Sequence, residues 1–144
     1  MAGARFSQIN LVCHDMAASL AFYRRLGLEI PDGAVWQASG RAHHAKADGA
    51  GAVDLQFDSR RLAHAYNAGF GAERGRVTIG VELDSREAVD ALWRSLIGES
   101  VQGLQPPFDA FWGARYAIVE DPDGNPVGLS SPADPARRSP PPEL

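Results

Sequence analysis

Residues 9–26 read INLVCHDMAASLAFYRRL, and residues 79–96 read IGVELDSREAVDALWRSL. Placed one over the other without a gap, the two stretches carry apolar residues at the same positions of an alternating segment and of the helical segment that follows it. The matched pairs are Ile9 and Ile79, Leu11 and Val81, Cys13 and Leu83, Phe22 and Leu92, Tyr23 and Trp93, and Leu26 and Leu96. Two unrelated segments rarely agree at so many core positions, so we interpret the chain as a tandem repeat.

Each half of this repeat predicts one strand, one helix and three further strands. Residues 6–14 alternate as a strand does, Asp15 stands at a helix N-cap position, and residues 16–26 carry the apolar stripe of a helix. Three short segments suit antiparallel strands because glycines separate them: residues 34–38, 42–47 and 52–57. In the second half, Asp84 or Ser85 caps the helix. The predicted fold class is α+β, with two βαβββ modules in tandem.

We place the first module at residues 1–69 and the second at residues 70–131. The remaining residues, 132–144, mix prolines with charges and have no apolar period, so burial cannot offset the entropy of ordering them. We expect them to form a mobile Pro-rich tail. Residues 59–70 are interpreted as a polar linker that holds His64 at the surface.

Composition narrows the class of protein. The chain has 144 residues, of which 44% are hydrophobic, enough for a substantial core. A formal net charge of -4 leaves no basic patch for a phosphate backbone, so we expect no nucleic-acid partner.

Residues 1–8 lack the pattern of a secretion signal, and no apolar run could span a bilayer. These two features predict a cytoplasmic protein without a membrane partner. The single Cys13 lies in an apolar run, and we interpret it as a core residue.

Two motifs carry a family resemblance. They are HDMAASLAFYRRLG at residues 14–27 and FWGARYAIVEDPDGN at residues 111–125, and together they resemble the vicinal oxygen chelate superfamily. This superfamily includes lactoylglutathione lyase, extradiol dioxygenases and bleomycin-resistance proteins, and the resemblance covers nearly the whole chain apart from the tail. It implies that the paired modules form a curved mixed sheet around a cup, often completed by dimerisation, so we expect a homodimer.

The resemblance also implies where a metal ion would be held. Metal-using members place His or Gln on the first strand of each module and Glu on the last strand. The matching positions here are Gln8, Gln56, Thr78 and Gly128. This set contains neither a carboxylate nor an imidazole, so nothing offsets the charge of the ion or its lost hydration. We therefore expect no metal and no other cofactor.

Histidines and aromatic residues supply the remaining candidates. His43 and His44 are adjacent on a predicted strand and point to opposite faces, so they cannot hold one ion together. We interpret them as a solvated pair on an edge strand, with the alternative that one of them enters the cup. Phe108, Phe111, Trp112 and Tyr116 surround a Pro-Pro loop, and this aromatic cluster either binds a ligand or fills a structural gap. His14 is expected at the surface.

These observations lead to one preferred function. Gln8 and Asn10 alternate with Ile9, Leu11 and Cys13, which are expected to face the helix. Gln8 and Asn10 are therefore expected on the concave side of the sheet, where buried polar groups need partners or a ligand. The candidate ligand-binding residues are Gln8, Asn10, Trp36, His44, Gln56, Phe108, Trp112 and Tyr116. The sequence predicts a metal-free glyoxalase/bleomycin-resistance-like protein that sequesters a small aromatic or amphipathic organic molecule. The alternatives are a metal-dependent or metal-free lyase, isomerase or dioxygenase of the same superfamily, and a structural dimer whose cup is filled.

Overall fold

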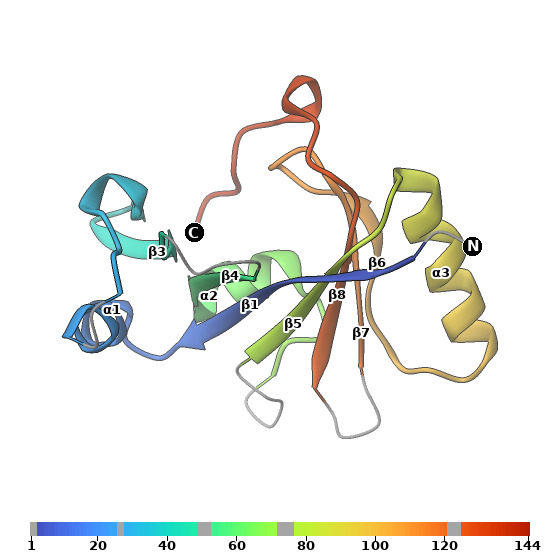
Figure 1. Ribbon diagram of the computed structural model, residues 1–144, viewed down its shortest axis with the longest axis horizontal. Helices are drawn as coiled ribbons and strands as arrows, with labels where there is room; N and C mark the ends of the chain where they lie inside the picture. Colours follow the sequence, from blue (N-terminus) through green and yellow to red (C-terminus); the bar gives the residue numbers. More distant parts are fainter. Residues whose placement is uncertain (1–2, 26–27, 49–52, 72–76, 121–124) are drawn as a thin grey trace.

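The computed structural model describes residues 3–25, 28–48, 53–71, 77–120 and 125–144, and within these ranges one mixed sheet of eight strands forms the centre (Figure 1). The strands are β1 (Arg5–Cys13), β2 (Trp36–Ala38), β3 (Arg41–Lys46), β4 (Asp54–Ser59), β5 (Val77–Glu82), β6 (Gly103–Asp109), β7 (Arg115–Glu120) and β8 (Pro126–Ser130). The α-helices are α1 (Met16–Arg25), α2 (Arg60–Tyr66) and α3 (Arg86–Gly98), and two 3-10 helices cover Asp32–Ala34 and Pro135–Arg137. The predicted α+β class is confirmed. The predicted end of the first helix at residues 26–27 and most of the final turn, residues 121–124, lie outside the described residues.

The sheet has the symmetry that a repeat predicts. Its strand order is β2-β3-β4-β1-β5-β8-β7-β6, and β1 and β5 pair antiparallel at the centre. On one side β1 runs parallel to β4, with Asn10 opposite Gln56. On the other side β5 runs parallel to β8, with Gly80 opposite Gly128. The two βαβββ halves therefore place equivalent residues at equivalent points of the curved sheet.

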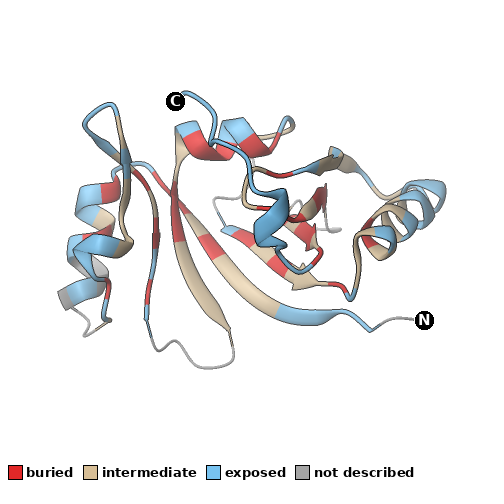
Figure 2. Ribbon diagram, turned by 90° about the horizontal axis from the view of Figure 1, so that it is seen from above, coloured by how far each residue is buried: buried red, intermediate tan, exposed pale blue. Residues whose placement is uncertain are grey.

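Helices α1 and α3 lie at opposite ends of the sheet (Figure 1). Asp15 caps α1, because its Oδ1 accepts the amide of Ala18 at 3.0 Å. Ser85, one of the two predicted candidates, caps α3 by accepting the amide of Ala88 at 3.1 Å. Each helix covers its own half of the core: α1 packs in a cluster with Phe57, and α3 packs in a cluster with Leu129. The buried residues are concentrated along the strands (Figure 2).

The expected linker at residues 59–70 is wrong in part, because residues 60–66 form helix α2. Ser59 is its N-cap and accepts the amide of Leu62 at 3.1 Å. Leu62 and Tyr66, one helical turn apart, are both buried, while His64 is exposed as expected. Packing of this one apolar stripe against the concave face of the sheet stabilises a helix of only seven residues.

The expected Pro-Pro loop is also wrong. Pro106 and Pro107 lie within β6, at the edge of the sheet. The pairing of β6 with β7 shifts its register between Gln105 and Phe108. Proline has no amide hydrogen to donate, so an edge strand with an irregular register is the place in a sheet that accommodates it.

After β8 the chain crosses back over the molecule toward β3 (Figure 1). The amide of Asp134 donates to the Gly113 carbonyl at 3.1 Å, and the amide of Ser139 donates to the Phe111 carbonyl at 3.0 Å. Leu144 packs against the buried hydrophobic cluster that contains Tyr66 and Tyr116. Residues 132–144 thus contact the core at several points, and their mobility stays a prediction. Among the described residues, no helix combines the length and the apolar character that a bilayer crossing demands.

Candidate ligand-binding site

A cavity of about 370 Å³ opens on the concave side of the sheet. Strands of both halves, helix α2 and the turn before β7 contribute to it. Its lining consists of Gln8, Asn10, Trp36, His44, Gln56, Asp58, Leu62, Tyr66, Phe111, Trp112, Tyr116 and Ser130. Seven of the eight predicted ligand-binding residues are in this set, and the fold brings them together from β1, β2, β3, β4, β7 and the turn before β7.

Phe108 is the predicted residue that does not line the cavity. Its ring packs edge-on against Trp112, with centroids 6.4 Å apart, and against Tyr116 at 6.0 Å. It belongs to the cluster that supports the cavity wall from behind. Its neighbour Phe111, which the sequence placed only in the aromatic cluster, reaches the lining instead.

Aromatic rings form one wall of the cavity. Trp36 and Phe111 have centroids 6.2 Å apart, and Phe111 and Trp112 are 5.1 Å apart. Trp112 continues the series to Tyr116 at 5.2 Å and to Tyr66 at 6.4 Å. Most of these pairs are edge-to-face, an arrangement that fixes each ring against the next. The wall therefore presents ring faces and edges in fixed directions.

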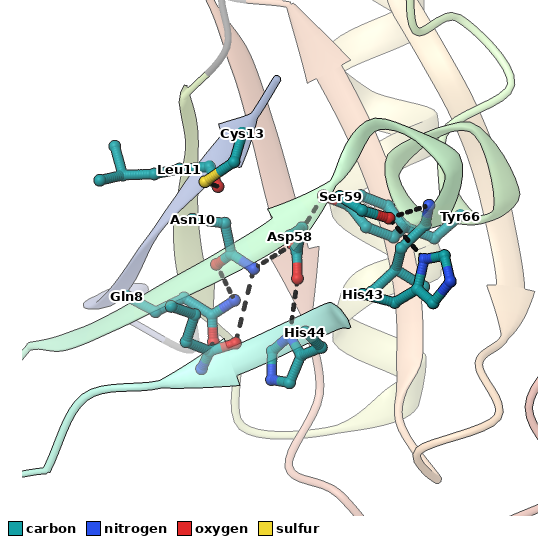
Figure 3. Close-up of polar contacts among 11 residues, drawn as sticks. Gln8, Asn10, Leu11, Cys13, His43, His44, Asp58, Ser59 and Tyr66 are labelled. Carbon is teal, nitrogen blue, oxygen red and sulfur yellow. Dashed lines mark hydrogen bonds and ion pairs between the residues drawn. The ribbon is translucent and has the colours of Figure 1, made fainter. Parts of the chain in front are cut away.

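Side-chain amides form a second part of the lining (Figure 3). Gln8 Nε2 donates to Asn10 Oδ1 at 2.8 Å, and Gln56 Nε2 donates to Gln8 Oε1 at 3.3 Å. Asn10 Nδ2 in turn donates to Asp58 Oδ2 at 2.7 Å. Each amide position is set by the next, so the chain of hydrogen bonds orients the polar wall before any ligand arrives.

Asp58 is the centre of this polar network. It is only 1% exposed, and its Oδ2 accepts from the Tyr66 hydroxyl at 3.0 Å as well as from Asn10. Its Oδ1 lies 2.6 Å from His44 Nδ1. A buried carboxylate needs such partners, because an unpaired charge in this environment is strongly unfavourable.

The two adjacent histidines have different surroundings, and the interpretation of a solvated pair is wrong. His43 is 1% exposed, and both its ring nitrogens are engaged: Nδ1 lies 2.8 Å from Ser59 Oγ and Nε2 lies 3.2 Å from the Ala38 carbonyl. His44 lines the cavity and retains 34% side-chain exposure. The pair is not solvated because β3 lies inside the sheet, between β2 and β4. His44 is therefore the histidine that enters the cup.

Sequence reasoning missed Asp58 and Tyr66. The period of two along β4 places Asp58 on the same face as Gln56, so alternation alone could have found it. Tyr66 required recognition of helix α2, for which Ser59 at the N-cap and the spacing from Leu62 to Tyr66 were the available signals. Asp58 follows directly after the expected strand at residues 52–57, and Tyr66 lies in the expected linker at residues 59–70.

Burial sets the ionisation of three groups at or near the site. Desolvation, reinforced by the charge of Asp58, raises the pKa of Tyr66 well above its usual value. Desolvation likewise raises the pKa of Tyr116. Both phenols therefore stay protonated at neutral pH, and Tyr66 acts as a hydrogen-bond donor to Asp58. Burial also raises the pKa of Cys13, which is 7% exposed, consistent with a core role.

Comparison with known proteins identifies the family. The model of the Glyoxalase/Bleomycin resistance protein/Dioxygenase superfamily matches residues 5–129. The chain belongs to this superfamily. No curated protein matches its sequence.

Solved structures agree on the fold of this superfamily member. One similar structure is that of a glyoxalase/bleomycin resistance protein/dioxygenase superfamily member from Vibrio splendidus 12B01, which is 13% identical. The alignment covers 92% of this chain and 100% of the Vibrio chain, with a TM-score of 0.56. The 2,3-dioxygenase LapB from Pseudomonas sp. KL28 is 14% identical over 90% of this chain and 43% of its own, with a TM-score of 0.61. The Mn(II)-bound glyoxalase from Novosphingobium aromaticivorans is 22% identical over 91% of this chain and 40% of its own, with a TM-score of 0.55. At these identities the likeness shows the fold alone.

The residues at the family's metal positions do not fit a metal ion. A Cβ added to Gly128 would stand inside contact distance of the Tyr116 hydroxyl, so this ring fills the space that a ligating side chain would need. Gln8 and Gln56 are hydrogen-bonded to each other, and Thr78 is 5% exposed. Within the described residues, no three His, Cys, Asp or Glu side chains lie together as a metal-binding group. The donor set is neutral, and a divalent ion needs charge or imidazole to replace its hydration.

Proposed function

We propose that this superfamily member binds a small, flat organic molecule in the cavity, with no metal ion at the four family positions. The observation that carries the proposal is the mixed lining, which combines fixed aromatic rings such as Trp36 and Trp112 with an ordered row of amides. A ligand with a conjugated face and a polar edge satisfies both parts of this lining. A saturated ligand forgoes the stacking with the rings, and a highly charged ligand places its charge beside an apolar surface.

The size of the cavity supports a ligand of this kind. Small-molecule sites span about 300–1,000 Å³ and combine a mostly apolar lining with a few polar groups that set orientation. The cavity here, at about 370 Å³, lies at the lower end of that range. A molecule of one or two fused rings matches it. Binding without reaction amounts to sequestration, the mode that bleomycin-resistance members of the superfamily use.

The test of binding uses tryptophan fluorescence made specific to the cavity. Trp93 belongs to α3 and packs against the core on that side of the sheet, whereas Trp36 and Trp112 line the cavity. Trp93→Phe therefore leaves only cavity tryptophans as reporters. A library of fused-ring compounds is expected to contain ligands that quench this signal with saturation, and quenching by the same compounds is expected to weaken in Gln8→Ala. A library without a saturating ligand contradicts the proposal.

The metal-free part has its own test. Protein purified without chelator is expected to carry far less than one divalent ion per chain by elemental analysis, and its thermal midpoint is expected not to rise with added Mn²⁺ or Zn²⁺. The reason is the neutral donor set together with the ring of Tyr116 over Gly128. One ion per chain that is lost on replacement of Gln8 or Gln56 contradicts this part and leaves ligand binding to be judged by fluorescence.

A further inference from the structure

The pairing of His44 with Asp58 in the cavity wall goes beyond what binding requires. We propose that His44, oriented by Asp58, is a general base that removes a proton from a flat, conjugated ligand held in the cavity. This proposal rests on the proposed binding function and adds a reaction to it. It needs neither a metal ion nor a redox partner.

The hydrogen bonds determine which nitrogen of His44 is available. Nδ1 lies 2.6 Å from Asp58 Oδ1, and an ionised carboxylate only accepts, so Nδ1 carries the proton of the neutral ring. The lone pair is then on Nε2, which hydrogen-bonds to none of the described residues. Because His44 lines the cavity and is 34% exposed, this lone pair is accessible to a ligand.

Asp58 is held so that it can support the positive charge that develops on His44. Asn10 and Tyr66 each donate to Oδ2, which leaves Oδ1 for the imidazole. The Tyr66 phenol keeps its proton, so it remains a donor throughout. A carboxylate fixed at 1% exposure beside the ring stabilises the imidazolium and sets its orientation, as the acid does in catalytic triads.

The neighbouring histidine provides an internal comparison. In His43 both ring nitrogens have partners and the ring is 1% exposed, which is the pattern of a structural histidine. In His44 one nitrogen is fixed by a buried acid, the other hydrogen-bonds to none of the described residues, and the ring lines the cavity. Two adjacent residues of one strand thus have opposite environments, and only one of them is arranged to accept a proton from a ligand.

The step itself balances without a co-reactant. Nε2 takes a proton from an acidic C–H of the ligand, and the electron pair of that bond moves into the conjugated system. The proton then returns at another carbon, which is an isomerisation, or passes to solvent while the electron pair expels a leaving group, which is an elimination. The aromatic wall keeps the plane of the ligand fixed during the transfer.

A generic carbon acid tests the base directly. In 5-nitrobenzisoxazole, loss of the proton on C3 converts the C=N bond to a nitrile and breaks the N–O bond, giving a cyanonitrophenolate that absorbs visible light.

The variants then show which residue is the base. Positioned general bases increase reaction rates by about 100- to 10,000-fold. We therefore expect His44→Gln to lower turnover about 100-fold, and Asp58→Asn to lower it as well, because an amide can donate to Nδ1 and leave the proton on Nε2. The matched control His64→Gln changes an exposed histidine outside the cavity and is expected to keep full turnover.

Three further measurements separate the possible outcomes. Binding of 6-nitrobenzotriazole, which has the same bicyclic shape but no N–O bond to break, is followed by quenching of Trp36 and Trp112, and melting curves show that each variant is folded. Added imidazole is expected to restore part of the turnover to His44→Ala, which a structural role would not allow. Turnover equal in wild type and His44→Gln, or absent while the analogue binds, overturns the general base and leaves the binding function intact. Failure of the analogue and every other flat probe to bind overturns both.

Discussion

The ring of Tyr116 lies over Gly128, with its hydroxyl where a side chain at position 128 would begin. Gly128→Ala is therefore expected to lower the free energy of unfolding by about 1–3 kcal/mol, the usual cost of overpacking a close-packed site. Urea unfolding monitored by circular dichroism measures it. In the double variant Gly128→Ala, Tyr116→Phe, part of the loss is expected to return because the nearest atom has been removed. Strict additivity of the two changes would show that the two residues do not interact.

The sequence alone predicted most of the fold and seven of the residues that line the cavity. The repeat between residues 9–26 and 79–96 predicted the paired modules because strand and helix periods are properties of neighbouring residues. The same alternation placed Gln8, Asn10 and Gln56 on one face of the sheet, and they do line the cavity.

What the sequence could not supply depends on contacts between distant residues. Asp58 acquires its role from Asn10, 48 positions away, and from Tyr66 on a helix too short to be stable by itself. His43 and His44 are identical residues, and only the packing of β3 between β2 and β4 separates a buried ring from a cavity ring. Local pattern carries no information on which partner a polar side chain will meet.

The buried phenols predict sensitivity to alkaline pH. Tyr66 and Tyr116 have raised pKa values in the folded chain because of desolvation, so above about pH 10 the unfolded chain releases these protons before the folded chain does. The stability they contribute is complete below pH 10 and falls at higher pH, by about 1.4 kcal/mol per pH unit for each phenol. Urea midpoints between pH 9 and pH 11.5 measure this slope. Tyr66→Phe is expected to make it shallower, and an unchanged slope in both single Phe variants would contradict the assignment.

Ser59 performs two structural roles, and this predicts a larger effect than capping alone. Its hydroxyl accepts the amide of Leu62 and also lies 2.8 Å from His43 Nδ1. Ser59→Ala removes the cap, which lowers the free energy of unfolding by about 1 kcal/mol. It also deprives a buried imidazole of a partner, which lowers the free energy of unfolding by about 1–3 kcal/mol more. Ser85→Ala is the matched control, because Ser85 caps α3 through Ala88. Thermal unfolding is expected to show the greater loss for Ser59→Ala, and equal losses would mean that the contact with His43 contributes nothing.

Gly113 determines whether residues 132–144 can lie against the core. Its backbone has a φ of 95°, which residues with a side chain rarely adopt. A Cβ at this position would also stand inside contact distance of the Asp134 carbonyl oxygen. Gly113→Ala therefore costs about 1–3 kcal/mol in strain, which the chain can relieve by releasing the tail. We expect amide hydrogen exchange to quicken by about 5- to 150-fold at Asp134 and Ser139, whose amides bond to the core, since 1.4 kcal/mol is a factor of ten.

The control for this prediction is Gly33→Ala. Among the described residues, no atom outside its two chain neighbours lies within 4 Å of a Cβ at position 33, so exchange at the tail amides is expected to stay at the wild-type rate. Release of the tail also frees Leu144 from the hydrophobic cluster that contains Tyr66 and Tyr116, two residues of the cavity lining. Ligands found by fluorescence are therefore expected to dissociate faster from Gly113→Ala than from Gly33→Ala. Equal dissociation from the two variants, with tail exchange quickened in the first, would show that the tail rests on the cavity wall without retaining what the cavity holds.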